Sequence, residues 1–422
     1  MTVLTNAEWT TEDARWRDAE DPLRNFRDQF AATAGGVYLC GNSLGRPSLA
    51  TQEALATAVQ LDWPGGVQSW HDWVSLPRTA GDVIAPLIGA APGEVIMGDS
   101  TTVNAFKLAW AALDANPTRR VIVTTDDNFP SNLYVLEGLL AAHSTRHELK
   151  VIRTDPSGGV TPSQVLDAVN HDTALVYLSH VAYGSGWVAD MAALTRIAQD
   201  SGALVLWDLS HSVGAIPVDL EAVGADLAVG CTYKYLNGAP GGPAFMYVRR
   251  AVQAQLRQPV WGWWGQQNRF EMGRDYNPFP AIERFTSGTP DVLGCLAALH
   301  GARLIQEAGV DRIYAKGQAL TSYAVELADA WLNGHGVRVV SPRDPNQRGC
   351  HITLHHPRAW QLCQALSDRH VIVDYRNPDR LRIGCSPLYT GFAEIREGMA
   401  RLRDILSENA HLAYPIRRAP VT

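Results

Sequence analysis

The stretch ALVLWDLSHS, residues 203–212, decides the fold that the sequence predicts. Its first five residues are apolar, and Asp208 follows them directly. We expect a buried strand that carries a carboxylate at its C-terminal end, the edge at which open α/β sheets hold their ligands. A second apolar run, residues 226–231, comes just before Lys234. The pattern therefore brings an aspartate and a lysine, 26 positions apart (234 − 208), to one edge of a sheet.

A carboxylate and an amine at such an edge suit pyridoxal phosphate (PLP), because the lysine can form a Schiff base while Asp208 keeps the pyridine nitrogen protonated. Lysine is rare in this chain. Lys107 and Lys316 lie in helix-like patterns, and Lys150 begins a strand-like run. Only Lys234 follows a buried strand in a loop with Gly, Pro and Asn. A surface lysine on a turn remains the alternative interpretation.

Composition favours an enzyme with a large core. The chain has 422 residues, 46% of them hydrophobic, which is enough for two domains. A net charge of −7 argues against a nucleic-acid partner. No apolar run approaches the roughly 18 residues of a membrane span, and the first residues do not resemble a signal peptide. The six scattered cysteines fit reduced thiols in the cytoplasm.

Strand-like and helical patterns alternate from about residue 93 to 250, which predicts an α/β fold with a mainly parallel sheet covered on both faces. A Pro/Gly/Trp-rich connection follows, and then a smaller α+β region. We expect an N-terminal arm, a large PLP-binding domain and a small C-terminal domain, over residues 1–45, 46–290 and 291–422. The expected strands of the two domains are 120–125, 149–153, 174–180, 203–208, 226–231 and 243–248, then 337–341, 350–355, 371–375 and 380–384.

Further segments fit a PLP site, each with a plainer alternative. The run DSTTVN, residues 99–104, can close onto a helix N-terminus that holds a phosphate, or can be an ordinary N-cap. Phe129 can stack on a flat ring or pack in the core. His211 can face the ring or be a buried histidine with other partners. The glycines of residues 238–242 lack the GxGxxG spacing of a dinucleotide site.

Several motifs, taken together in this order, resemble those of the kynureninases, which are PLP enzymes of fold type I related to class-V aminotransferases. The resemblance covers most of the chain. The motifs are YLCGNSLG (38–45), NFPSNLY (128–134), WDLSHS (207–212), GCTYKYLNG (230–238), GWWG (262–265), GTP (288–290) and LRIGCSPLY (381–389).

The resemblance implies hydrolysis of L-kynurenine to anthranilate and L-alanine, and less efficient cleavage of 3-hydroxykynurenine, in tryptophan catabolism. It also implies a homodimer with shared active sites. Lys234, Asp208 and Tyr233 would be catalytic, and Arg382 would bind the substrate α-carboxylate. Ser43, Trp70 and His71 would lie near the aromatic end of the substrate. The cofactor would contact Thr101, Thr102, Phe129, Pro130, Ser131, Asn132, Ser179, Asp208, His211, Tyr233 and Lys234, with Trp263 and Thr289 contributed by the partner subunit.

Two positions depart from the family pattern, since Asn132 and Cys40 stand where Asp is usual. We expect Asn132 to act through hydrogen bonds rather than charge. Three other functions stay open: a cysteine desulfurase or aminotransferase of the same fold, for which Cys350 is the candidate reactive thiol; a PLP-binding protein without turnover; and a nicotinamide dehydrogenase. Intact Lys234, Asp208 and Arg382 argue against the second, and the missing glycine fingerprint argues against the third.

Overall fold

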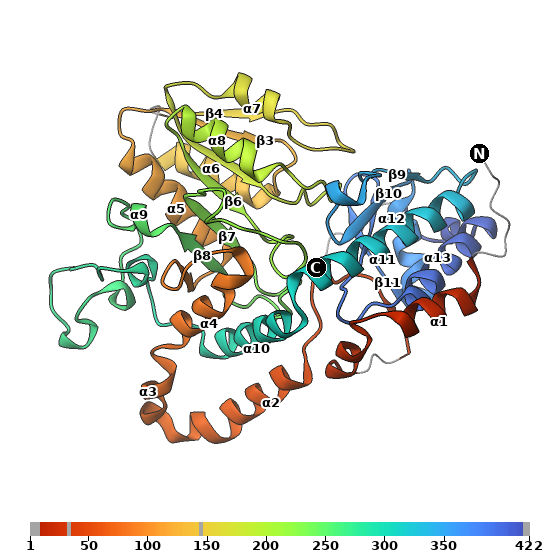
Figure 1. Cartoon of the computed structure of the whole chain (residues 1–422), viewed down its shortest axis with the longest axis horizontal. Coiled ribbons are helices and arrows are strands. Elements are labelled where there is room, and N and C mark those ends of the chain that lie inside the picture. The colour runs from red at the N-terminus through yellow and green to blue at the C-terminus, as the bar shows by residue number, and fades with distance from the viewer. Residues whose placement is uncertain (1–8, 32–34, 143–146, 417–422) are drawn as a thin grey trace.

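The computed structural model describes residues 9–31, 35–142 and 147–416. Figure 1 shows two bodies, one built around a large sheet and one that joins the C-terminal third of the chain to helix α1 (Thr11–Glu20). Residues 1–8 and 32–34 of the expected N-terminal arm lie outside the described residues. The site is built mainly on the large sheet, and the smaller body supplies Arg382.

The large sheet has seven strands in the order β2-β8-β7-β6-β5-β3-β4. The four strand pairs from β7 to β4 are parallel, whereas β8 pairs antiparallel with both β7 and β2. The α/β fold with a mainly parallel sheet is therefore confirmed. The strands are β2 (Val95–Met97), β3 (Val121–Thr125), β4 (Glu148–Ile152), β5 (Thr173–Ser179), β6 (Leu204–Asp208), β7 (Leu227–Gly230) and β8 (Phe245–Val248).

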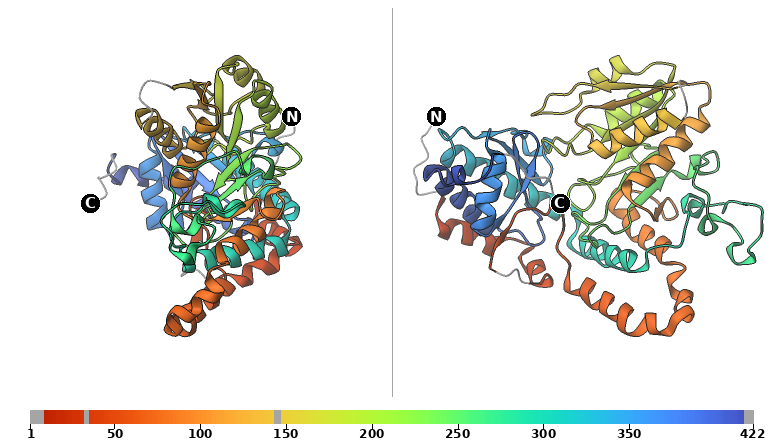
Figure 2. Two further views of the ribbon diagram at one scale, coloured as in Figure 1. Left: turned by 90° about the vertical axis from the view of Figure 1, so that its left-hand side faces the viewer. Right: turned by 180° about the vertical axis from the view of Figure 1, so that it is seen from behind.

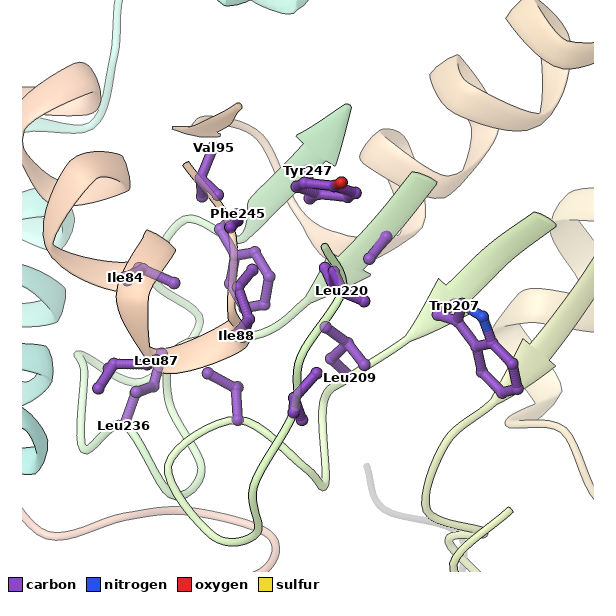
Figure 3. Close-up of a cluster of buried hydrophobic side chains, with 14 of the residues drawn as sticks. Ile84, Leu87, Ile88, Val95, Trp207, Leu209, Leu220, Leu236, Phe245 and Tyr247 are labelled. Atoms are coloured by element: carbon purple, nitrogen blue, oxygen red, sulfur yellow. The ribbon is translucent and has the colours of Figure 1, made fainter. Parts of the chain in front are cut away.

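Side chains alternate across strand β6, and this alternation aims Asp208. Val205 and Trp207 pack into one core, and the indole N–H of Trp207 donates to Thr195 at 3.0 Å. Leu206 packs into the core on the opposite face, against helices α5 (Thr101–Ala115) and α6 (Pro130–Ala142). Because strand side chains alternate with period two, Asp208 follows Leu206 toward the α5–α6 face. Figure 3 shows Trp207, Leu209, Leu220 and Phe245 among the buried side chains of the first core.

The smaller body contains a four-stranded antiparallel sheet in the order β12-β13-β10-β9. Strand β1 (Val37–Tyr38) pairs with β11 (Val371–Ile372) and so joins the N-terminal segment to this body. Its remaining strands are β9 (Arg338–Val339), β10 (His351–His355), β12 (Asp374–Arg376) and β13 (Arg380–Gly384). Its main helices are α11 (Val310–Trp331), α12 (Ala359–Asp368) and α13 (Phe392–Ser407).

The remaining helices cover the large sheet or lead into it. Helix α2 (Leu49–Thr57) packs against α10 (Val292–Ala308), and the segment that follows α2 protrudes from the large body before it reaches α3 (Trp70–Trp73) (Figures 1 and 2). None of the helices in the described ranges has the length and apolar character needed to span a membrane. The others are α4 (Leu76–Ile84), α7 (Pro162–Ala168), α8 (Met191–Asp200) and α9 (Arg250–Gln253).

The sequence predictions match every strand of the large sheet except β2, which has only three residues. The run 371–375 is split, because β11 pairs with β1 whereas β12 pairs with β13. Helix α10 packs into the core of the large sheet through Cys295, Ala298 and Ala302. That packing favours a domain boundary after α10 rather than at residue 291, and the division into domains remains a proposal.

Candidate active site

A cavity of about 110 Å³ opens at the C-terminal edge of the large sheet. It lies where β5 and β6 end and where helices α5 and α6 begin, so several loops contribute side chains to one place. This is the position at which open α/β sheets hold ligands. The cavity is lined by Thr101, Thr102, Phe129, Ser131, Asn132, Ser179, Val181, Tyr183, Asp208, Ser210, His211, Tyr233 and Lys234.

Lys234 lies in this cavity as predicted. Burial lowers the pKa of its amine, because removal from water disfavours the charged form. The other lysines have different partners: Lys107 pairs with Asp99, Lys316 pairs with Asp21, and Lys150 donates to backbone carbonyls. Within the described part of the chain, Lys234 is therefore the one lysine placed to react with a ligand in this cavity.

Asp208 is held by a chain of amides that begins on helix α6. Its Oδ1 accepts from the backbone N–H of Ser210 at 2.8 Å, and its Oδ2 accepts from Asn132 Nδ2 at 2.8 Å. The same Asn132 nitrogen donates to Asn128 Oδ1 at 2.9 Å, and Ser179 Oγ donates to that oxygen at 2.8 Å. The hydrogen bonds fix the carboxylate toward the cavity, and they agree with the hydrogen-bonding role expected for Asn132.

Phe129 and His211 form further parts of the wall. The Phe129 ring centre lies 5.8 Å from Lys234 Nζ, and the ring packs edge-on against Tyr183. The imidazole of His211 packs 5.2 Å from that of His351. Burial, followed by the charge of Lys234, lowers the pKa of His211 well below its usual value. His211 is therefore a neutral ring beside the cavity at physiological pH.

The N-terminus of helix α5 forms the end of the cavity where Thr101 and Thr102 lie. Ser100 caps the helix by accepting the backbone N–H of Val103 at 3.3 Å. The first-turn N–H groups of a helix this long favour an anion such as a phosphate. The N-cap and phosphate-binding interpretations of this segment are therefore compatible, since Ser100 caps the helix while the two threonines line the cavity.

These residues fit PLP. An amine of lowered pKa suits the aldehyde, a fixed carboxylate suits the pyridine nitrogen, and an aromatic ring can lie against the flat ring of the cofactor. The helix N-terminus suits the phosphate. Tyr233 and Ser131 line the same cavity, and Pro130 is the first residue of α6.

Arg382 lies next to the cavity, behind Tyr183. It is 1% exposed, and its Nη1 donates to the Tyr183 backbone oxygen at 2.8 Å. Its Nη2 donates to Ser43 Oγ at 2.9 Å and to the carboxylate of Asp374. The structure thus places Ser43 beside the arginine that the resemblance assigns to the substrate carboxylate. Its expected position near the aromatic end of the substrate stays a prediction.

A tight backbone approach brings Ser43 to this position. The N–H of Gly45 donates to the Tyr233 carbonyl at 2.7 Å, and a side chain at position 45 would collide with the Lys234 backbone. Cys40 lies in the same segment, where burial, followed by the charge of Asp374, raises the pKa of its thiol to about 11. This departure from the family pattern therefore leaves a neutral group beside Arg382.

Four predicted residues lie away from the cavity in a single chain. Trp70 packs against Trp264, and the side chain of His71 is 93% exposed. The indole N–H of Trp263 donates to Thr289 Oγ1 at 3.3 Å, and neither of these two residues lines the cavity. The positions of Trp263 and Thr289 agree with their assignment to a partner's site, which the single chain does not test. The expected place of Trp70 and His71 near the aromatic end of the substrate stays a prediction.

Sequence reasoning missed Val181, Tyr183 and Ser210 in the cavity wall and His351 behind it. Their signal was available in part, because Val181 and Tyr183 follow strand β5 directly and Ser210 follows Asp208.

Comparison with known proteins defines the class. The family model for class-V aminotransferases matches residues 73–374. A cysteine desulfurase from Thermococcus onnurineus NA1 superposes with a TM-score of 0.80 at 19% identity, covering 91% of this chain and 98% of that one. A C-DES mutant with glycine covalently linked to the PLP cofactor superposes with a TM-score of 0.78 at 17% identity, covering 90% and 99%. The chain is therefore a PLP-type enzyme of the aminotransferase class-V fold.

Sequence relatives narrow the class to one family. A kynureninase of Burkholderia pseudomallei strain K96243 is 41% identical over 421 residues, covering 98% of this chain and all of that protein. A kynureninase of Pseudomonas fluorescens is 40% identical over 419 residues, covering 97% and 99%. The chain belongs to the kynureninase family, as the motif resemblance predicted.

Proposed function

We propose that this chain hydrolyses L-kynurenine to anthranilate and L-alanine, with PLP bound at Lys234. The observation that carries the proposal is that Lys234 and the hydrogen-bonded Asp208 face one cavity in a chain about as long as the kynureninases it matches. Cleavage of 3-hydroxykynurenine to 3-hydroxyanthranilate is a slower second reaction. The pathway context is tryptophan catabolism.

Lys234 would transfer the substrate proton, and Asp208 would stabilise the protonated cofactor ring. When bound, PLP supplies an aldehyde for the substrate amine and a ring that withdraws electrons from the substrate. Because burial lowers its pKa, the Lys234 amine is available in neutral form to take the proton from the substrate Cα and to return it. Asp208 would accept the N–H of the pyridine ring and would hold the ring nitrogen protonated.

Arg382 and Tyr233 would act on the substrate and the cofactor phosphate. Arg382 binds the α-carboxylate, since a planar guanidinium matches a carboxylate better than an ammonium does. The Cys231 thiol, followed by burial, raises the pKa of Tyr233, so that its hydroxyl stays protonated and can donate. In the overall reaction, water adds its oxygen to the γ-carbonyl carbon, the Cβ–Cγ bond breaks, and a proton joins Cβ of alanine.

A homodimer completes the proposal. Trp263 and Thr289 are exposed and bonded to each other, as expected of residues that reach into a neighbouring subunit. Subunit mixing tests this: Lys234→Ala and Trp263→Ala proteins, each impaired alone, should regain about a quarter of wild-type activity after unfolding and refolding together, because a statistical mixture holds one intact site in every second dimer. No recovery would contradict shared sites. A cytoplasmic location is proposed as well, since the six cysteines are thiols and not disulfides.

Cysteine desulfurase activity is not proposed, although desulfurases share the fold. Cys350 is 1% exposed at the edge of β10, and its Sγ lies 3.4 Å from the Ala215 carbonyl oxygen. Burial raises the pKa of this thiol, so it does not supply the mobile thiolate that a desulfurase needs.

The direct test is release of fluorescent anthranilate from L-kynurenine by the purified protein. Activity should require PLP and should disappear in Lys234→Ala. The matched control is Lys150→Ala, which removes an exposed lysine that does not line the cavity and should keep wild-type activity. Absence of anthranilate from the PLP-loaded wild-type protein would overturn the proposal.

A further inference from the structure

A buried cluster of charges surrounds Arg382 and includes two residues that have no assigned role. Asp374 lies directly opposite Arg382 in the antiparallel pairing of β12 with β13. Arg376 lies two residues further along β12, on the same face of the strand. Asp374 Oδ2 accepts from Nη2 of Arg382 and, at 3.0 Å, from Nη2 of Arg376. A single carboxylate oxygen therefore joins the two guanidinium groups.

Ser43 links the cluster to the N-terminal segment. Its hydroxyl donates to Asp374 Oδ2 and accepts from Arg376 at 3.2 Å and from Arg382 at 2.9 Å. A hydroxyl has one donor and two acceptor positions, so Ser43 is fully used. Although burial alone would raise it, the pKa of Asp374 is lowered by Arg382, Arg376 and the Ser43 hydroxyl, and the carboxylate stays charged.

The charge balance suits a carboxylate ligand. Arg382 is almost fully buried, and an unpaired buried charge is costly. Asp374 alone would neutralise Arg382 and leave little attraction for a substrate anion. Arg376, whose side chain is 36% exposed, adds a second positive charge. Two arginines and one aspartate leave a net charge of +1 for the ligand.

The geometry leaves part of Arg382 free. Asp374 uses one oxygen on Nη2, and Nη1 makes one hydrogen bond, to the carbonyl of Tyr183, which lines the cavity. A guanidinium has five N–H groups, so Nη1 carries a second hydrogen besides the one that it donates to Tyr183. Asp374 could instead compete with the substrate by occupying the carboxylate-binding N–H groups of Arg382. Both carboxylate oxygens of Asp374 would then be expected to accept from the guanidinium.

We propose that Asp374 is a positioning residue for the substrate carboxylate: with Ser43 it holds Arg382 in its binding orientation, while Arg376 keeps the cluster positive. The proposal rests on the proposed function, because it takes an amino acid with a free α-carboxylate as the ligand. The competitor interpretation predicts the opposite effect when Asp374 is neutralised.

The test compares two ligands that differ only at the carboxylate. L-Alanine and L-alaninamide are titrated into the PLP-loaded enzyme, and binding is followed by the cofactor absorbance. Asp374→Asn should weaken the binding of L-alanine by about tenfold or more, which is the effect of losing a charged hydrogen bond. It should change the affinity for L-alaninamide by less than about twofold. With L-kynurenine as substrate, KM should rise while kcat changes much less.

Asp379→Asn is the matched control, because Asp379 lies in the same hairpin and pairs with His355 and Arg380 instead of Arg382. It should leave both affinities unchanged. Ser43→Ala should repeat the carboxylate-specific loss and keeps the proposal testable if Asp374→Asn fails to fold. Equal losses for both ligands, or tighter binding of L-alanine, would overturn the proposal. The titrations need no turnover, so a failure of the hydrolase assay remains distinguishable from a failure here.

Discussion

Replacement of Asn132 by aspartate is the most revealing change at the cofactor end of the site. Asn132 uses its nitrogen to donate to Asp208 Oδ2 at 2.8 Å and to Asn128 Oδ1 at 2.9 Å. Asn132→Asp keeps the shape of the side chain but replaces this donor with a carboxylate oxygen. Two acceptors then face each other across each contact. Asn132 is 2% exposed, so water cannot relieve the conflict.

The expected cost follows from Coulomb's law and from protonation. Two charges about 4 Å apart repel by about 4 kcal/mol at an effective dielectric constant of about 20. The alternative is to keep one carboxyl protonated, which from an ordinary pKa of about 3.9 costs about 1.4 kcal/mol for each pH unit, or about 4 kcal/mol at pH 7. We therefore expect Asn132→Asp to lower the free energy of unfolding of the PLP-free protein by about 2–4 kcal/mol at pH 7.

The sign of the pH dependence is also fixed. A neighbouring negative charge raises the folded-state pKa of one carboxyl of the pair, so the folded variant binds more protons than the unfolded chain. The stability of the variant relative to wild type is therefore highest below about pH 4, the pKa of the carboxyl in the unfolded chain. It falls as the pH rises through the raised pKa of that carboxyl in the folded protein. Bound PLP should reduce the loss of stability, because Asp208 would hold its protonated ring nitrogen beside the pair.

Urea unfolding of the PLP-free proteins at pH 5 and pH 8 measures this effect. Gln255→Glu is the control, since it introduces the same kind of charge at an exposed position. The midpoint of Asn132→Asp should fall well below those of wild type and control at pH 8, and by less at pH 5. Equal midpoints at pH 8, or a loss that does not depend on pH, would refute the assignment of Asn132 as a donor to Asp208.

The remaining predictions concern the reaction itself. Borohydride reduction should attach PLP to Lys234, and a label found on Lys107 would contradict the site. Arg382→Lys should weaken L-kynurenine binding by roughly 2–3 kcal/mol, measured by KM and by competitive inhibition, because the paired hydrogen bonds of the guanidinium are lost; an unchanged affinity would point to another carboxylate-binding group. The kcat/KM for kynurenine should exceed that for 3-hydroxykynurenine, because the resemblance implies Asn at the position of Thr289 in family members that prefer the hydroxylated substrate, and the short Thr289 hydroxyl cannot reach an added ring hydroxyl as that amide could; the reverse order would count against this role of Thr289. Cys350→Ser should retain anthranilate formation, whereas its loss would revive a reactive-thiol mechanism.

The sequence could predict the catalytic edge of the sheet because the information there is local. Apolar runs that end in Asp208 or just before Lys234 mark strand ends, and parallel strand ends meet at one edge. Phe129 is predicted at that edge because its segment follows the expected strand 120–125. Thr101 is predicted near a phosphate for a different reason, because a helix begins at its segment. Strand β2 was not predicted, because a run of three apolar residues is too short to show a periodicity.

The Arg382 cluster could not be predicted in this way. Ser43 and Asp374 are 331 residues apart, and their contact depends on how the N-terminal segment packs against the smaller body. The resemblance supplied Arg382 and Ser43 but not their mutual contact, and it gave no role to Asp374. The positions of Trp263 and Thr289 depend on a second subunit, which one sequence cannot place.

Product analysis tests the central claim most directly. The PLP-loaded protein is incubated with L-kynurenine, and anthranilate, alanine and kynurenine are quantified in the same sample. Hydrolysis at the Lys234 and Asp208 site predicts one anthranilate and one L-alanine for each kynurenine consumed. Kynurenine consumed without these two products in equal amounts, as in transfer of its amino group to an acceptor, would contradict the account.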